Sequence, residues 1–253
     1  MAQRGRRSRL EPLVDLVMGT AHEEEDVLGR PELKLTPARK EALERWTDDC
    51  WGFLTGKDPE TGRPVIWTMD ERDKEHPIKP FPENLDYLHY LVELLDNPPE
   101  PLTVIEKSSQ VMATTTIMLH SSHDCALHSG RKVMLSKHKE AEAEAILRDK
   151  VRFPWSQMPS WLQRALPISK TPANRVTWTN TNSMIWGLTE NAAAAEARGN
   201  TYTRGLIDEG EYQDGLQALI TAMRPRTEQV VLWSTPAIGG HGASVTKRLL
   251  ATT

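Results

Sequence analysis

Cysteine is scarce in this 253-residue sequence, and no long hydrophobic run occurs in it. The two cysteines, Cys50 and Cys125, fit a reducing compartment such as the cytoplasm. The longest apolar run, residues 112–119, is too short and too rich in threonine for a transmembrane helix, and the amino terminus has no apolar signal segment. We therefore expect a soluble, cytoplasmic location and no membrane partner.

A paired metal-ligand spacing is also missing. Cys125 lies close in the sequence to His120, His123 and His128. One cysteine with scattered histidines lacks the paired spacing that a structural zinc site needs. We therefore expect no zinc site in this segment.

The sequence has no excess of positive charge, since 31 Lys and Arg residues face 35 Asp and Glu residues and the net charge is -4. Proteins that coat nucleic acid with their whole surface are usually basic, so this class is disfavoured, although a motor that moves DNA can use local basic patches. With 38% hydrophobic and 26% charged residues, the composition is typical of one globular domain with a sizeable core.

A complete phosphate-binding loop, G-x-x-x-x-G-K-[ST], is absent as well. Most of its ingredients nevertheless follow an apolar strand predicted at 102–105. Met112 and Ala113 occupy the usual Gly and Lys positions, but Lys107 stands at the front of the segment and Thr114 at its end. Lys107 is then either a phosphate ligand reaching across the loop or a solvated residue at a strand end. In the first case, Thr114 supplies the hydroxyl for Mg²⁺.

Acidic and hydroxyl side chains follow two further strands. Asp208 and Glu209 come after an apolar strand at 206–207, and Ser234, Thr235 and Pro236 come after a strand at 230–233. Parallel strands bind ligands at their carboxyl ends, so these groups are expected at one edge with the loop. Taken singly, each is also compatible with an ordinary strand end. Their combination favours a nucleotide site.

Strand and helix patterns alternate along the chain. Helices are predicted at 37–54, 86–95, from 114 and at 139–149, and further strands at 65–67, 132–135, 175–179 and 183–188. A proline-rich connector is expected around 154–167. Such alternation indicates an α/β fold with a largely parallel sheet flanked by helices.

These motifs resemble the ATPase domain of the large terminase subunit, the DNA-packaging motor of tailed bacteriophages. The likeness runs from about residue 77 to about residue 242, and it implies a P-loop NTPase fold of the ASCE, RecA-like type. It rests on a loop similar to the family's K-S-R-Q-x-G-x-[ST]-T, a Walker B strand, a coupling motif and an Arg-Gly segment before Walker B. The loop residues that it marks as nucleotide-binding are Lys107, Ser108, Ser109, Gln110, Val111, Met112, Ala113, Thr114 and Thr115.

The resemblance also implies a role for each remaining site residue. Thr114 and Asp208 hold Mg²⁺, the latter through water, and Glu209 is the catalytic base that polarises the attacking water. Arg198 matches the trans-acting arginine finger, with a plain surface arginine as the alternative. The coupling motif, Ser234, Thr235 and Pro236, senses the γ-phosphate of ATP.

Two features make the resemblance less complete. Phe81 and Asn84 match the adenine-contacting segment only loosely, because the family more often uses a glutamine there. Ser109 and Met112 replace an arginine and a glycine of the loop, and both changes are expected to weaken nucleotide binding. A degenerate, nucleotide-independent scaffold therefore stays open beside an active enzyme, as does another ASCE-type helicase or DNA translocase.

The domain expectation is a basic and acidic tail with a short helix over residues 1–36 and the ATPase domain over residues 37–253. The nuclease domain of a full terminase is not expected in this chain. The resemblance implies ATP and Mg²⁺ as ligands, double-stranded DNA, a portal protein and a small terminase subunit as partners, and the cytoplasm of an infected bacterium as location. It also implies a homo-oligomeric ring when assembled, with the isolated domain possible as a monomer.

Overall fold

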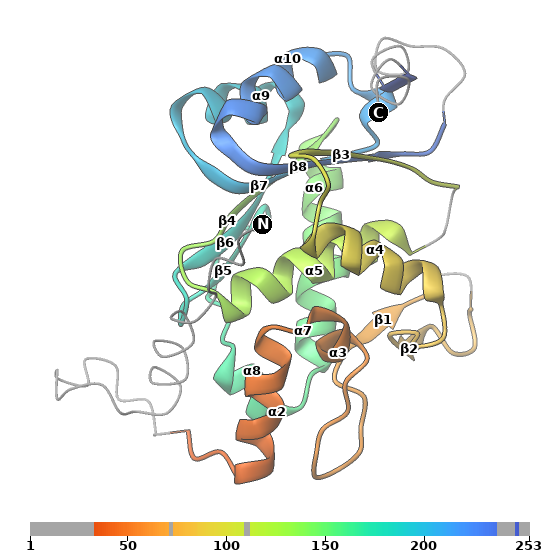
Figure 1. The fold of residues 1–253 in the computed structure, drawn as a ribbon, viewed down its shortest axis with the longest axis vertical. Coiled ribbons are helices and arrows are strands. Elements are labelled where there is room, and N and C mark those ends of the chain that lie inside the picture. Colours follow the sequence, from red (N-terminus) through yellow and green to blue (C-terminus); the bar gives the residue numbers. More distant parts are fainter. Residues whose placement is uncertain (1–32, 71–72, 109–111, 237–245, 248–253) are drawn as a thin grey trace, which may run out of the picture.

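The computed structural model describes residues 33–70, 73–108, 112–236 and 246–247. Its centre is a sheet of six strands: β3 (Leu102–Glu106), β4 (Lys132–Lys137), β5 (Arg175–Trp178), β6 (Ser183–Thr189), β7 (Tyr202–Asp208) and β8 (Thr227–Ser234). Their order in space is β3-β8-β7-β4-β6-β5 (Figure 1). Only the β5–β6 pair is antiparallel. The predicted α/β class with a largely parallel sheet is thus confirmed.

Helices cover both faces of this sheet (Figure 1). On one face lie α9 (Glu190–Gly199) and α10 (Leu216–Met223). On the opposite face lie α5 (Ala113–Leu127) and α6 (Glu140–Leu147). Five further helices belong to the same side of the core: α2 (Pro37–Thr47), α3 (Cys50–Leu54), α4 (Asp86–Asp96), α7 (Phe153–Gln157) and α8 (Ser160–Ala165). Burial on two faces explains why β8 reads as one continuous apolar run.

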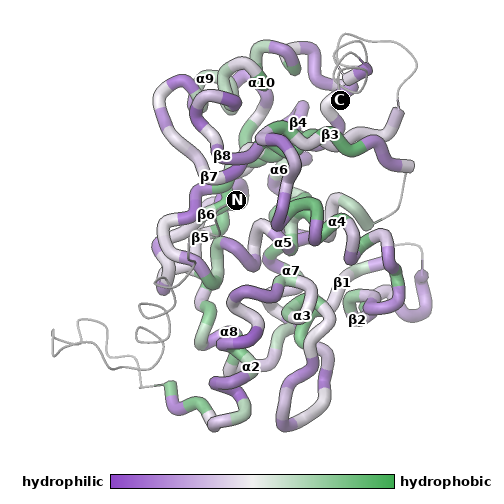
Figure 2. Tube along the Cα trace, in the orientation of Figure 1, coloured by the Kyte–Doolittle hydropathy of each residue, from purple (hydrophilic) through white to green (hydrophobic). Residues whose placement is uncertain are grey.

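The core therefore has two layers, one on each face of the sheet. Along β8, Val231 and Trp233 belong to the larger layer, whereas Val230 and Leu232 belong to the smaller one. Full burial of each such side chain contributes about 1.5–3 kcal/mol relative to exposure. Hydrophobic segments occur along the strands of the sheet and in the helices packed on it, whereas hydrophilic residues are frequent in the connections between them (Figure 2).

Several predicted boundaries are corrected by the structure. The helix predicted at 37–54 is two helices, because Asp49 leaves the helical path and its carboxylate accepts a hydrogen bond from the backbone N–H of Gly52 at 2.7 Å, which starts α3. The strand predicted at 65–67 begins at Trp67 and forms β1 (Trp67–Met69), which pairs with β2 (Ile78–Pro80).

The region predicted as a connector is helical. A π-helical turn, Arg148–Arg152, follows α6 and leads into α7 and α8. Pro154 lies in the first turn of α7 and Pro159 directly precedes α8, both positions where proline is compatible with a helix. Of the predicted tail, residues 1–36, the first 32 lie outside the described residues. Thr36 caps α2 by accepting a hydrogen bond from the N–H of Arg39.

Gly187 in β6 allows a close approach that matters for the site. A Cβ atom at this position would lie 3.0 Å from the Cβ atom of Ala143 in α6. The missing side chain lets α6 pack directly on β6, next to the carboxyl end of β4.

Candidate nucleotide site

Three strand ends meet at the carboxyl edge of the sheet. Glu106 of β3 is level with Ser234 of β8, and Asp208 of β7 is level with Trp233 of β8. Because β8 lies between the other two strands, the Ser-Thr-Pro segment lies between the predicted phosphate loop and the predicted acids.

Lys107 lies next to the coupling motif. Its backbone N–H donates to the carbonyl of Ser234 at 3.0 Å, which extends the β3–β8 pairing beyond the strand end. Its ammonium nitrogen lies 3.4 Å from the Thr235 hydroxyl oxygen. The charge of Lys107 also lowers the pKa of Asp208, although other groups act on that carboxyl more strongly. Lys107 is thus within electrostatic range of the acidic strand.

The residue before α5 has a backbone conformation that favours glycine. Met112, the residue before the helix, has a left-handed backbone conformation with φ of 46°, which glycine adopts most readily. Its side chain makes no capping hydrogen bond to the first turn. Ser108 is exposed, Ala113 and Thr115 are buried, and Ser109, Gln110 and Val111 lie outside the described residues.

Thr114 links the start of α5 to β8, the strand that precedes the coupling motif. Its hydroxyl oxygen accepts a hydrogen bond from the indole N–H of Trp233 at 2.9 Å. Trp233 is fully buried, so this contact fixes the position of the threonine against β8. The second lone pair of the hydroxyl remains available to a cation.

Asp208 and Glu209 share a cation that the sequence did not reveal as part of the site. The ammonium nitrogen of Lys137, at the end of β4, lies 3.2 Å from Asp208 Oδ2 and 2.6 Å from Glu209 Oε2. Burial lowers the pKa of Lys137, but the two carboxylates raise it above its ordinary value overall. For Asp208, burial raises the pKa, Lys137 lowers it and Glu209 raises it, with a net increase.

Glu209 itself faces solvent more than its neighbour. Its side chain is 48% exposed, whereas that of Asp208 is 5% exposed. Glu209 has a left-handed backbone with φ of 51°. The turn thus buries one acid and leaves the other open at the edge, an arrangement suited to one metal ligand and one base.

Gln213 is a second site residue that the sequence did not single out. Its buried amide donates to the carbonyl of Asp208 at 2.8 Å, and its oxygen accepts from the Ser136 hydroxyl at 3.1 Å. These bonds tie the end of β7 to the end of β4. Lys137 could have been found by the rule that selected Lys107, a polar residue at the carboxyl end of a strand, but the predicted strand stopped at residue 135. No pattern marked Gln213.

Ser234 is turned inward rather than toward the loop. It is buried, and its hydroxyl accepts from the N–H of Glu211 at 3.3 Å and donates to the carbonyl of Thr235 at 3.3 Å. Thr235 is partly exposed and Pro236 is exposed. Of the coupling motif, Thr235 is therefore the residue whose side chain meets Lys107.

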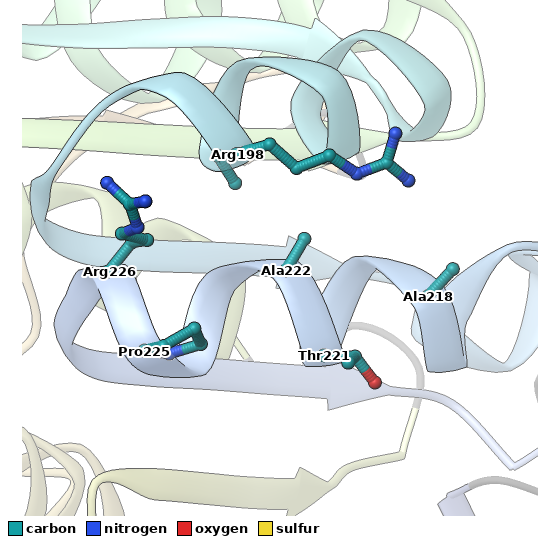
Figure 3. A pocket seen from close by; sticks show the side chains of 7 residues that line it. Arg198, Ala218, Thr221, Ala222, Pro225 and Arg226 are labelled. Carbon is teal, nitrogen blue, oxygen red and sulfur yellow. The ribbon is translucent and has the colours of Figure 1, made fainter.

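Arg198 lies away from these groups. It belongs to the last turn of α9, which leads into the amino end of β7, whereas Glu209 follows the carboxyl end. Six residue steps of β7 span roughly 20 Å. Arg198 lines a groove of about 460 Å³ between α9 and α10, extending over Ala222 and Ala218, with Arg226 at the other end (Figure 3). This groove is not part of the carboxyl-edge cluster.

The two predicted adenine-contacting residues differ in solvent exposure. Phe81 is 4% exposed and packs edge-on against Trp51 at 5.9 Å between ring centroids. Asn84 is exposed, just before α4. Neither has a contact with the carboxyl-edge cluster in the interactions of the described residues, and their roles stay predictions.

The histidines near Cys125 are engaged in separate contacts. His120 accepts from Arg204 at Nδ1 and donates to Asp96 at Nε2, at 2.8 Å each, whereas His123 Nε2 lies 2.6 Å from the Trp46 carbonyl. Among the described residues, no group of three or more His, Cys, Asp or Glu side chains could hold a metal ion. None of the helices in this part of the chain has the length and apolar character to cross a bilayer.

The residues at the edge fit a phosphate and Mg²⁺. The uncapped start of α5 and the Lys107 ammonium favour an anion, and the Thr114 hydroxyl and Asp208 carboxylate are oxygen ligands of the kind Mg²⁺ takes. Mg²⁺ usually binds one or two protein oxygens together with substrate phosphates, so a larger acidic cluster is not needed.

The fold matches that of solved phage proteins. The large terminase of bacteriophage HK97 has a TM-score of 0.53 and 14% identity, over 75% of this chain and 37% of that one. Two weaker likenesses are to the large terminase ATPase domain of Thermus phage P74-26 (TM-score 0.43, 12% identity, 59% of this chain and 64% of that one) and to the ADP complex of the large terminase of a thermophilic bacteriophage (0.40, 11%, 59% and 38%).

The HK97 likeness confirms the expected fold, in that this chain shares its α/β fold with part of a phage large terminase. This chain spans little more than a third of the HK97 protein. No protein-family model matches the sequence, and no curated protein matches it either.

Proposed function

We propose that this chain is an ATPase whose hydrolysis of ATP drives double-stranded viral DNA into a procapsid. The observation that carries the proposal is the meeting of five side chains at the ends of strands β3, β7 and β8 and the start of α5: Lys107, Thr114, Asp208, Glu209 and Thr235. Phosphoryl transfer needs little covalent chemistry from a protein, so positioning and charge at such an edge supply most of the acceleration.

Each residue has a defined task in this proposal. Lys107 and the start of α5 bind the β- and γ-phosphates of ATP, and Thr114 and Asp208 hold Mg²⁺, which neutralises charge on the phosphates. Glu209 orients a water whose oxygen bonds to the γ-phosphorus as the bond to the ADP oxygen breaks. Thr235, in contact with Lys107, senses whether the γ-phosphate is present.

Arg198 completes the site of a neighbouring subunit. The length of β7 separates it from Glu209 of its own chain, which supports action in trans within a ring. The partners in the complete motor are double-stranded DNA, a portal protein and a small terminase subunit, and the isolated chain is a slow monomer. Residues 37–253 form the ATPase domain.

The test is Mg²⁺-ATP hydrolysis and fluorescent ATP binding by the wild type, Lys107→Ala and Glu209→Gln. Lys107→Ala should weaken binding by at least about tenfold, since a charged phosphate contact is lost. Glu209→Gln should bind normally but hydrolyse about 10²–10⁴-fold more slowly. Lys132→Ala, at the exposed amino end of β4, is the matched control and should behave as the wild type.

Normal binding by Lys107→Ala would refute the assignment of this lysine. A wild type that neither binds nor hydrolyses ATP would favour the nucleotide-independent scaffold, for which Met112 at the glycine position is the specific argument. ATP-dependent strand separation by the chain would favour the helicase alternative.

A further inference from the structure

The Lys137 ammonium group bridges the two acids of the candidate site. It is in ion-pair contact with both Asp208 and Glu209, and its side chain is only 7% exposed. Bridging of this kind places a monovalent cation 3.2 Å from the Asp208 carboxylate oxygen, on the acid that a divalent cation would need. Two cations at those oxygens repel each other strongly in a partly buried site.

A third acid gives the ammonium group another partner. Glu142 of α6 has a carboxylate oxygen 4.0 Å from Lys137 Nζ and is 40% exposed. Its place depends on the close packing of α6 on Gly187 of β6. A lysine on its flexible four-carbon stem can exchange such partners by a change of rotamer, without moving the strand.

We propose that Lys137 is a positioning residue that holds Asp208 and Glu209 in place while the metal site is empty and moves to Glu142 when a divalent cation binds. This inference rests on the proposed function, because it concerns the metal site of that reaction. Lys137 neutralises the negative charge of two adjacent carboxylates, one of which is buried. A metal ion that binds there must therefore compete with this internal ion pair.

The consequence is that the site takes up a divalent cation well only when nucleotide phosphates contribute to its binding. Without the phosphates, the cation must displace Lys137 and gains only one or two bonds to carboxylate oxygens. With them, the phosphates supply additional oxygen ligands. Lys137 thereby couples metal loading to nucleotide loading.

The experiment measures Mn²⁺ binding to the full chain by electron paramagnetic resonance, with and without ADP. Lys137→Met should bind Mn²⁺ about tenfold more tightly than the wild type without ADP, because a competing charge is removed. Glu142→Gln should bind it several-fold more weakly, because the ammonium group loses its alternative partner. These opposite signs distinguish a competing cation from a structural role, which would weaken binding in both variants.

Matched controls are Lys132→Met, at the far end of β4, and Glu144→Gln, on α6 but outside the ion-pair group. Both should bind Mn²⁺ as the wild type does. If Lys137→Met does not fold, as urea unfolding would reveal, Glu142→Gln alone decides, and unchanged or tighter Mn²⁺ binding in that variant overturns the inference.

The outcomes separate the two proposals. Suppose that the wild type binds Mn²⁺ with ADP but folded Lys137→Met binds Mn²⁺ no more tightly than the wild type. This result overturns the role of Lys137 and leaves the proposed function standing. Absence of Mn²⁺ and ADP binding in the wild type and every variant overturns the proposed function, and this inference with it.

Discussion

Met112 shows at the scale of one residue how the loop differs from a glycine-containing one. The resemblance to the family loop marks this position as a departure, because Met112 replaces a glycine there, and in the structure Met112 has a left-handed backbone conformation. A non-glycine residue there costs of order 1–3 kcal/mol. The side chain also limits how closely a phosphate can approach the backbone.

We predict that Met112→Gly tightens ATP binding several-fold, because the backbone N–H groups become accessible to phosphate. Stability should change by no more than about 1 kcal/mol, since relief of strain offsets the loss of apolar contact. Binding is measured with fluorescent ATP and stability by urea unfolding.

The matched control is Asn182→Gly, which relieves the same backbone conformation, with φ of 52°, far from the site. It should leave ATP binding unchanged. Weaker binding by Met112→Gly would mean that the methionine side chain itself supports the nucleotide.

The sequence predicted the charged site residues that follow or end strands β3 and β7. It did not predict Lys137 of β4, the partner of the two acids. Lys107, Asp208 and Glu209 carry local signals, a strand followed by polar residues. The ion pair of Lys137 with the two acids exists only because β4 lies beside β7, which no local pattern encodes.

At the scale of elements, α5 is buried on nearly every side, with polar as well as apolar residues inside. His123 is one of these, and it contacts the Trp46 carbonyl and the ring of Phe53. Burial lowers its pKa to about 4, and the Trp46 carbonyl only partly opposes this shift. His120 has a lowered pKa as well, through burial and Arg204. The folded state therefore requires neutral imidazoles here.

We predict that stability is fully present above about pH 6.5 and falls as the pH drops toward 4, because the unfolded chain binds protons that folded His123 refuses. At pH 5, the loss from His123 should be about 2 kcal/mol. The free energy of unfolding from urea titrations at pH 7.5 and pH 5 gives this difference.

In His123→Gln, the pH-dependent loss should shrink by about that amount. His89→Gln, on the exposed face of α4, should keep the wild-type dependence. An equal loss in the wild type and His123→Gln would contradict the assignment.

Element boundaries were predictable where the pattern is regular and not where a side chain intervenes. The strand at 102–106 and the helix at 86–96 follow apolar periodicity closely. The break at Asp49 depends on a side-chain cap. The helices α7 and α8 depend on buried tryptophans, Trp155 and Trp161, that hold them to the core.

On the scale of the whole molecule, Arg198 and Glu209 lie at opposite edges of one sheet. If the active unit is a ring, each variant of a pair can supply what the other lacks. We predict that Arg198→Ala and Glu209→Gln are each inactive, and that their equal mixture recovers roughly a quarter of wild-type ATPase activity, since only mixed contacts in one direction are complete.

Steady-state phosphate release at a concentration where the wild type is active measures this recovery. Arg226→Ala, from the other end of the same groove, is the matched control and should be active alone. Full activity of Arg198→Ala alone would remove the arginine from the mechanism.

The alternation of strands and helices predicted the class of the whole molecule, and the motif resemblance predicted its fold, which the HK97 likeness confirms. Strand order was beyond local patterns. That β8 separates β3 from β7 follows from long-range pairing, which the motifs did not specify.

This strand order has a consequence for biosynthesis. Within the described sheet, β3 is an edge strand that pairs with β8, and the contact between Lys107 and Thr235 joins positions 128 residues apart. A nascent chain therefore leaves the ribosome with β3 unpaired until β8, the last strand of the described sheet, has been translated. Pairings this distant form slowly and leave strand edges open to wrong partners. The chain therefore assembles the edge that carries the candidate nucleotide site as one of its last folding events.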